Sequence, residues 1–215
     1  MIPGSTVLLG YCDLAAAGAR LLHHVHALDA SLEESTLVLL GLSVAVRTYA
    51  DISLVIVRDV VPASIATAFA AALTDLLEGK KVVFLTAPSV PMSSAEEPFV
   101  FWTQYPMAAL DLPSAQFQRI PLAKWTLNDA FLCACLHFFQ VEALPLTVLL
   151  VRGYKYTGRS TDGTAEAITK LGSALPHVLK ALGVSKAFEV DTKAASVMKM
   201  LTMDTTRPDN GILYN

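Results

Sequence analysis

The sequence predicts a single α/β domain in which a mixed β-sheet is flanked by helices. Short runs of β-forming residues alternate along the chain with longer helix-forming segments, which is the pattern of α/β proteins. Leu146–Val151 is a continuous apolar run of the kind found in central strands. At 215 residues the chain is long enough for one sizeable core. We therefore assign residues 1–203 to one domain and residues 204–215 to a flexible C-terminal tail.

The first half of the chain alternates between strands and helices. β-forming residues predict strands at Thr6–Tyr11, at Thr36–Val46 with a break near Gly41, at Ile52–Val57 and at Lys81–Thr86. An alanine-rich segment predicts a helix at Leu14–Leu28. A second helix is expected to begin at Pro62, because proline suits the first turn of a helix, and to end at Gly79.

Residues 87–124 interrupt this alternation. Six prolines divide the segment, and Phe99–Thr103 is its candidate strand. Irregular segments of this length are uncommon in compact domains and are usually functional or bound to something. We therefore expect a long irregular excursion at this point of the domain.

Regular structure is expected to resume after residue 124. Thr126 or Asn128 caps a strongly apolar helix that runs to Val141. The predicted central strand follows, and then a polar loop. A helix from about Thr164 to Leu182 interrupted by Pro176, a short strand near Phe188 and a last helix from Asp191 to about Met203 complete the domain.

Composition narrows the class of protein. The chain is 53% hydrophobic and 16% charged, with a mean hydropathy of +0.50, which is apolar for a soluble monomer. No apolar stretch is long enough for a transmembrane helix, and the N-terminus lacks the basic region of a signal peptide, so we expect a cytoplasmic protein with no membrane partner. A net charge of -3 excludes a strongly basic nucleic-acid binder. The surplus of apolar residues indicates a surface that another protein covers.

One loop approaches a nucleotide-binding motif. Gly153–Ser160 follows the predicted central strand and differs from the phosphate-binding G-x-x-x-x-G-K-[ST] pattern by Arg159 in place of lysine. A guanidinium does not reproduce the compact charge of that lysine, and Tyr154 and Tyr156 make the loop interior bulky. A turn beside a strand end is the interpretation we favour, and a nucleotide-binding or phosphorylase-like enzyme that uses this loop is the alternative.

Other patterns are typical of structural residues. Gly41-Leu-Ser43-Val-Ala45 is close to a nucleophile elbow, but the β-forming residues on both sides favour a strand or hairpin for Ser43. His23 and His26 share a helix face without a third ligand, and His137 is expected in the core. Cys133 and Cys135 are expected as small core residues, because their side chains diverge on one helix. We therefore expect no catalytic residue, no cofactor and no metal.

The end of the chain is its most distinctive feature. Asp204–Gly211 contains Pro208, Asn210 and Gly211, so it cannot continue a helix and is typical of a tether. Leu213-Tyr214-Asn215 then places an apolar residue and a tyrosine beside the terminal carboxylate. This ending predicts a tail that inserts into a pocket on a larger partner.

The C-terminal half resembles the proteasome assembly chaperone 1 family. The resemblance rests on the apolar helix after Asn128, the strand Leu144–Val151, the polar loop and helix that follow, and the hydrophobic-Tyr-X ending. It covers about the last 90 residues of the chain. The chain departs from the animal members, which carry a long acidic N-terminal extension. The sister subunit of the same chaperone is an alternative.

The resemblance implies a chaperone that is not an enzyme. It implies a phosphorylase-like fold without an active site, and a heterodimer with a second, related proteasome assembly chaperone subunit. The heterodimer is expected to sit on the α-subunits of the assembling 20S core particle, in the cytoplasm and also in the nucleus, and to block premature binding of regulators. The implied partner-binding residues are Ile212, Leu213, Tyr214 and Asn215.

Overall fold

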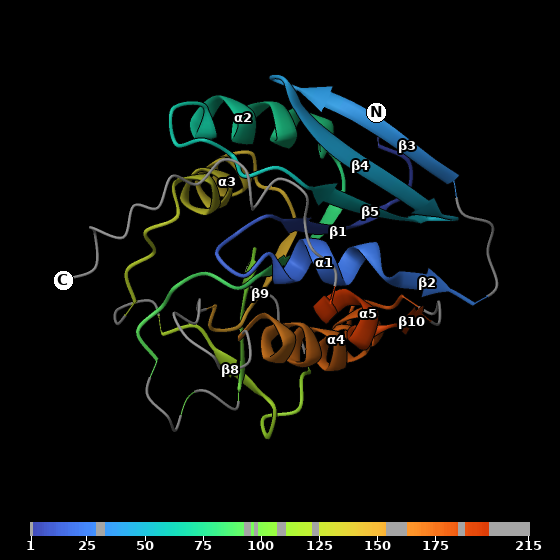
Figure 1. The fold of residues 1–215 in the computed structure, drawn as a ribbon, viewed down its shortest axis with the longest axis vertical. Coiled ribbons are helices and arrows are strands. Elements are labelled where there is room, and N and C mark those ends of the chain that lie inside the picture. Colours follow the sequence, from blue (N-terminus) through green and yellow to red (C-terminus); the bar gives the residue numbers. More distant parts are fainter. Residues whose placement is uncertain are drawn as a thin grey trace.

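A computed structural model describes residues 2–28, 33–92, 96, 99–106, 111–121, 125–153, 163–184 and 188–197 of the chain (Figure 1). In chain order its elements are β1 (Thr6–Tyr11), α1 (Ala17–His23), β2 (Val25–Ala27), β3 (Glu33–Leu39), β4 (Leu42–Tyr49), β5 (Ile52–Val57), α2 (Ala66–Leu76), β6 (Lys81–Thr86), β7 (Val100–Tyr105), β8 (Phe117–Arg119), α3 (Ala130–Val141), β9 (Leu146–Leu150), α4 (Gly163–Ala181), β10 (Phe188–Val190) and α5 (Thr192–Val197).

The sheet is mixed and lies between two helical layers. Its eight strands have the order β3-β4-β5-β1-β6-β9-β7-β8, and β2 pairs separately with β10. The four central strands β5, β1, β6 and β9 are parallel, whereas β4 and β7 run antiparallel to their central neighbours. Helices α2 and α3 cover one face, and α1, α4 and α5 cover the other (Figure 1). The predicted α/β class, with a mixed sheet flanked by helices, is confirmed.

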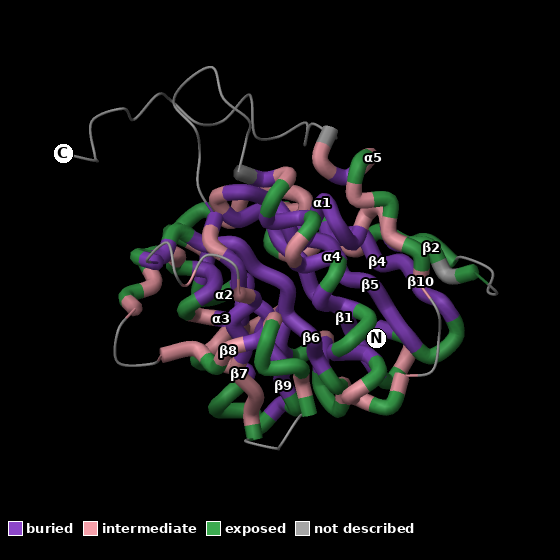
Figure 2. The backbone as a smooth tube through the Cα atoms, turned by 90° about the horizontal axis from the view of Figure 1, so that it is seen from below, coloured by how far each residue is buried: buried purple, intermediate pink, exposed green. Residues whose placement is uncertain are grey.

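Burial explains why the central strands are so apolar. Strands β1, β5 and β9 are buried along their whole length, because each has neighbours on both sides and helices over both faces. The tube in Figure 2 is correspondingly purple along the middle of the sheet. One core lies between the sheet and α1, α4 and α5, and a second lies between the sheet and α2 and α3.

The strand predictions agree closely with the structure. The predicted bounds of β1, β5 and β6 are those observed, and the break near Gly41 is the turn of the β3–β4 hairpin, where Leu40 and Gly41 both have positive φ. The predicted strand at Leu146–Val151 is β9, one residue shorter. Sequence reasoning missed β8, which pairs with β7 inside the irregular segment.

Several helix predictions were wrong in extent. The helix predicted at Leu14–Leu28 ends at His23, because Val25–Ala27 leaves the helix and pairs as β2 with β10. Helix α2 begins at Ala66 because the residues from Pro62 form a turn, in which the Ile65 N–H donates to the Pro62 carbonyl at 3.0 Å. Pro176 does not interrupt α4, which stays continuous because its apolar side is buried against α1 and the sheet.

The cap of α3 also differs from the prediction. Neither Thr126 nor Asn128 caps the helix; the Asp129 carboxylate accepts from the Leu132 N–H at 2.9 Å. Only part of the predicted last helix is described, as α5, and the predicted tail 204–215 lies outside the described residues. No helix within the described ranges is both long and apolar enough to span a membrane.

Candidate functional site

The predicted partner-binding residues cannot be placed in this structure. Ile212, Leu213, Tyr214 and Asn215 lie outside the residues that the structure describes, and so does 154–162, the greater part of the motif-like loop. The structure does describe the end of β9, after which that loop begins, and helix α5, which precedes the tail.

Gly153 shows why a glycine follows β9. Its N–H donates to the Pro88 carbonyl at 2.8 Å, and a Cβ added at this position would lie 1.8 Å from the Ala87 oxygen. The glycine therefore allows two backbone segments to meet. A phosphate-binding loop needs its backbone N–H groups to face the ligand. The N–H of Gly153 is already bonded within the protein.

The other sequence candidates do not come together. Ser43 lies exposed in β4, as expected for a hairpin residue. His23 ends α1 and His26 lies in β2, so the predicted shared helix face was wrong. His137 and Cys133 are exposed and only Cys135 is buried, which corrects two of the predicted core positions. Within the described part of the chain no three metal-ligating side chains form a cluster.

A buried polar cluster closes the carboxyl ends of β1 and β6. Asp13 follows β1 and is 2% exposed. Its carboxylate accepts from the Ala87 N–H, from the Thr86 hydroxyl at 3.2 Å and from the Ala15 N–H at 3.2 Å. Burial raises the pKa of Asp13 to about 6, and the hydrogen bond from Ala87 offsets part of that shift.

Tyr11 connects this cluster to α3. Its hydroxyl donates to Asp129 Oδ2 at 2.8 Å, while Oδ1 of the same carboxylate caps α3. Burial raises the pKa of Tyr11 well above its usual value, and the negative charge of Asp13 adds to the effect. Open α/β sheets usually bind ligands at the carboxyl ends of their parallel strands. Here the carboxylates near those strand ends, Asp13 and Asp129, accept hydrogen bonds from other groups of the protein.

Buried arginines fix the helices that lead to the tail. The guanidinium of Arg20 donates to the Ala195 carbonyl at 3.0 Å and to the Ser196 carbonyl at 2.6 Å, which ties α5 to α1. Arg47 donates to the carbonyls of Leu22 and His23 at the end of α1. Neither arginine was singled out from the sequence. The available signal was a single arginine within an otherwise apolar helix or strand, which indicates a buried side chain that bonds to backbone carbonyls. The chain therefore enters residues 198–215 from a firmly held helix.

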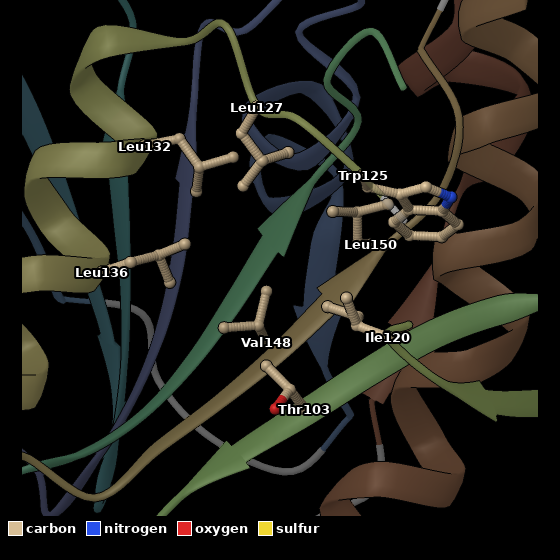
Figure 3. Close-up of a pocket in the computed structure, with 8 residues that line it drawn as sticks. All are labelled: Thr103, Ile120, Trp125, Leu127, Leu132, Leu136, Val148 and Leu150. Atoms are coloured by element: carbon tan, nitrogen blue, oxygen red, sulfur yellow. The ribbon is translucent and has the colours of Figure 1, made fainter. Parts of the chain in front are cut away.

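Among the described residues lies an apolar cavity of about 110 Å³. It lies between α3, strands β7 and β9, and the chain that approaches α3 (Figure 3). Its lining is apolar except for one threonine and comprises Thr103, Ile120, Trp125, Leu127, Leu132, Leu136, Val148 and Leu150. The ring of Trp125 meets Phe101 edge to face, with centroids 4.5 Å apart. A space of this size and lining suits one apolar group and offers no acid or base.

Comparison of the sequence with family models gives no match, and no curated protein matches it either. Comparison with solved structures gives clear matches. PbaB of Pyrococcus furiosus, an archaeal proteasome activator, aligns with a TM-score of 0.62 at 16% identity, covering 90% of this chain and 88% of that chain. A Thermoplasma acidophilum protein of unknown function aligns with a TM-score of 0.58 at 12% identity, covering 85% and 77%.

A third solved structure comes from the same archaeon as the first. PbaA of Pyrococcus furiosus, an archaeal homolog of proteasome-assembly chaperone, aligns with a TM-score of 0.51 at 13% identity, covering 86% of this chain and 80% of that chain. Identities this low establish a shared fold. The chain thus shares the fold of these proteins over most of its length.

Proposed function

We propose that the chain is a subunit of a proteasome assembly chaperone. The observation that carries the proposal is the fold shared with PbaB, which extends over 90% of this chain and 88% of that chain. The sequence adds an independent reason, because it ends in the hydrophobic-Tyr-X pattern Leu213-Tyr214-Asn215. The carboxylates of Asp13 and Asp129 at the strand ends are hydrogen-bonded within the protein, which suits a binding protein better than a hydrolase or transferase that needs free acid and base groups.

The proposed partner within the chaperone is a second, related α/β subunit. Its support is the apolar character of the surface: Leu28, Val38, Leu40 and Val141 are each more than half exposed. Permanent hetero-complexes cover such side chains with a large, hydrophobic interface. The heterodimer works in the cytoplasm and the nucleus, where proteasomes assemble. The sister subunit of the same chaperone is the alternative identity, and the two share the proposed role.

The proposed docking element is the tail. Tyr214 buries its ring in a pocket of the α-ring while its hydroxyl finds a polar partner, and Leu213 adds apolar area. The terminal carboxylate of Asn215 pairs with a basic group of the pocket through charge-assisted hydrogen bonds. Ile212 packs at the entrance of this α-ring pocket. A tail bound in this way blocks regulators that use the same pockets while the 20S core particle is incomplete.

The test is binding of the heterodimer to α-rings, with the tag at the N-terminus so that the carboxylate stays free. Tyr214→Ala removes an aromatic anchor worth about 2 kcal/mol at an interface centre, which predicts roughly thirtyfold weaker docking by the tail. One glycine added after Asn215 displaces the carboxylate by about 3.5 Å and is expected to be nearly as harmful. Asn215→Ala keeps the carboxylate in place and is the matched control.

The readout separates docking from folding. Each variant is first paired with its partner subunit, and its thermal unfolding is measured. We expect unchanged pairing and unchanged Tm for all of them, because the substitutions lie beyond the domain. Equal α-ring binding by wild type, Tyr214→Ala and the glycine-extended chain would contradict tail docking.

A further inference from the structure

Strand β3 forms an edge of the eight-stranded sheet. It pairs with β4 in one unbroken antiparallel register, from Glu33 opposite Thr48 to Leu39 opposite Leu42. Within the described ranges no strand pairs with its other side, and it is the outermost strand of the ribbon in Figure 1. The outward-facing N–H and C=O groups of such a strand are a template for pairing with another chain.

The exposed end of this hairpin is apolar. Val38 is 73% exposed and Leu40 is 53% exposed, while Leu37, Leu39 and Leu42 are partly exposed. Natural edge strands are usually protected by a lysine, a proline, a bulge or an inward-facing charge. Residues 35–42 contain no charged residue and no proline, and the register of the hairpin has no bulge. The part of the edge next to the hairpin turn therefore lacks the usual protection against pairing.

The sequence of the edge complements itself. If a second copy pairs antiparallel with Val38 opposite Val38, then Leu37 lies opposite Leu39 of the second copy, and the three central pairs of β3 are all apolar. Residues that lie directly opposite share a face of the sheet. The four leucines therefore gather on the face of α2, where Leu37 and Leu39 already border the core.

Charge favours the same register. The carboxylates of β3 itself, those of Glu33 and Glu34, lie at the other end of the strand, outside the overlap centred on Val38. Glu34 also forms an ion pair with Arg58 of its own molecule, with 3.7 Å between Nη2 and Oε1. A register centred on Thr36 instead places Glu34 opposite Val38 of the second copy, which opposes a charge to an apolar side chain. The preferred alignment is therefore the one centred on Val38.

We propose that β3 is a self-association edge, through which two copies of this chain join their sheets antiparallel about a twofold axis at Val38. The proposal does not depend on the role in proteasome assembly. The overlap is short, so the interface is smaller than that of a permanent dimer and the dimer is expected to dissociate on dilution into the micromolar range.

The test measures the monomer–dimer equilibrium of the purified full chain by sedimentation equilibrium, from about 1 to 200 µM. Val38→Lys places two ammonium groups opposite one another at the axis, and we expect the dissociation constant to rise at least about tenfold. Ser43→Lys is the matched control: Ser43 pairs with Val38 across the hairpin and is exposed, but lies on β4, away from the edge. Its dissociation constant should stay within about twofold of wild type.

A charge exchange tests the symmetry of the contact. Val38→Lys and Val38→Glu should each be monomeric alone, and an equimolar mixture should dimerise, because residue 38 of one copy meets residue 38 of the other. Circular dichroism and Tm confirm that the variants are folded, as expected for a position 73% exposed.

Three results would overturn the proposal. They are a wild-type chain that stays monomeric over the whole range, a Val38→Lys variant that dimerises as wild type does, and a mixture of the opposite charges that remains monomeric. A wild-type monomer whose binding to a related α/β subunit is lost in Val38→Lys would reassign the edge to that subunit.

Discussion

At the scale of single residues, Asp13 is a carboxylic acid held almost entirely away from water. Its carboxyl group is buried at the junction of β1 and β6 and receives donors from three residues. Hydrogen bonds favour the charged carboxylate, whereas burial disfavours it, and the pKa of about 6 shows that burial dominates.

This balance predicts how stability depends on pH. The folded-state pKa of Asp13, about 6, is above the ordinary value of 3.8, so the folded protein holds this proton where the unfolded chain has lost it. The contribution of Asp13 to stability is therefore fully present below about pH 4 and is lost as pH rises to about 6. The loss is on the order of 3 kcal/mol.

The measurement is urea unfolding at several pH values across that window. Asp13→Asn cannot titrate, so its free energy of unfolding should lack this downward slope, although its overall stability falls because one amide N–H now faces a backbone donor. Asp75→Asn, on the exposed side of α2, is the matched control and should keep the wild-type slope. Identical slopes for wild type and Asp13→Asn would contradict the prediction.

At the scale of elements, α1 is held against the sheet by close backbone contact. A Cβ added to Gly18 would lie 2.2 Å from the Leu85 oxygen, and one added to Gly10 would lie 2.6 Å from the Gly18 oxygen. Two glycines, one on the helix and one on β1, thus let the helix touch β1 and β6 without side chains between them. Helix α1 in turn packs against α4 and α5.

Two glycine-to-alanine substitutions separate helix propensity from packing. Gly18→Ala gains up to about 1 kcal/mol of helix propensity but forces α1 away from the sheet. We expect a net loss of at least about 2 kcal/mol, because the obstruction is backbone. Gly172→Ala in α4 gains the same propensity and meets the ends of two side chains, Thr192 Cγ2 at 3.0 Å and Leu21 Cδ1 at 3.3 Å, which can shift slightly, so it should be within about 0.5 kcal/mol of wild type. Thermal unfolding of both variants checks this, and equal Tm values would show that α1 adjusts freely.

The same scale shows which elements the sequence predicts. Strands β1, β5 and β6 follow from their own residues, because short apolar runs rich in β-branched residues are typical of strands that are buried on both faces. Strand β2 does not, because Val25 leaves the helical pattern only by pairing with Val190, far along the chain. The cap of α3 is a similar case. Asn128 and Asp129 are both capping residues, and the hydroxyl of Tyr11 selects Asp129.

The candidate site was less predictable than the fold. Asp13, Arg20 and Arg47 were not identified from the sequence, since their roles depend on carbonyls and N–H groups of distant segments. Gly153 was identified as the start of a loop that approaches a phosphate-binding pattern, for which we favoured a turn beside a strand end, but its close contact with Ala87 was not foreseen. The tail was identified from its residue types alone and remains a prediction.

At the scale of the whole molecule, the enzyme alternative makes a distinct prediction. We expect no measurable binding of ATP, GTP or nucleosides in calorimetry, because the N–H of Gly153 is bonded to Pro88 and Arg159 stands where a phosphate-binding loop has lysine. The control is a nucleotide-binding protein measured under the same conditions. Micromolar affinity that Arg159→Ala abolishes would replace the chaperone proposal with the enzyme one.

The last prediction concerns the behaviour of the chain alone and with its partner. A composition 53% hydrophobic, with apolar side chains exposed on β3 and α3, predicts that the isolated chain is produced in low yield and self-associates. Co-expression with a related α/β subunit should give a soluble complex of one copy of each, because an obligate interface commonly buries more than about 2,000 Å² in total. Light scattering and yield measure both effects, and co-expression with an unrelated α/β protein of similar size is the control.

Val38→Lys distinguishes the two sources of association in that experiment. If β3 pairs only with itself, the variant should lose the concentration-dependent dimer yet still require the related subunit for full solubility, because the rest of the apolar surface is unchanged. If the related subunit also binds at β3, the variant should lose both the concentration-dependent dimer and the complex with that subunit. A wild-type chain that stays soluble on its own and does not bind the related subunit would contradict the proposed heterodimer. Loss of the concentration-dependent dimer in Val38→Lys would still support the self-association edge.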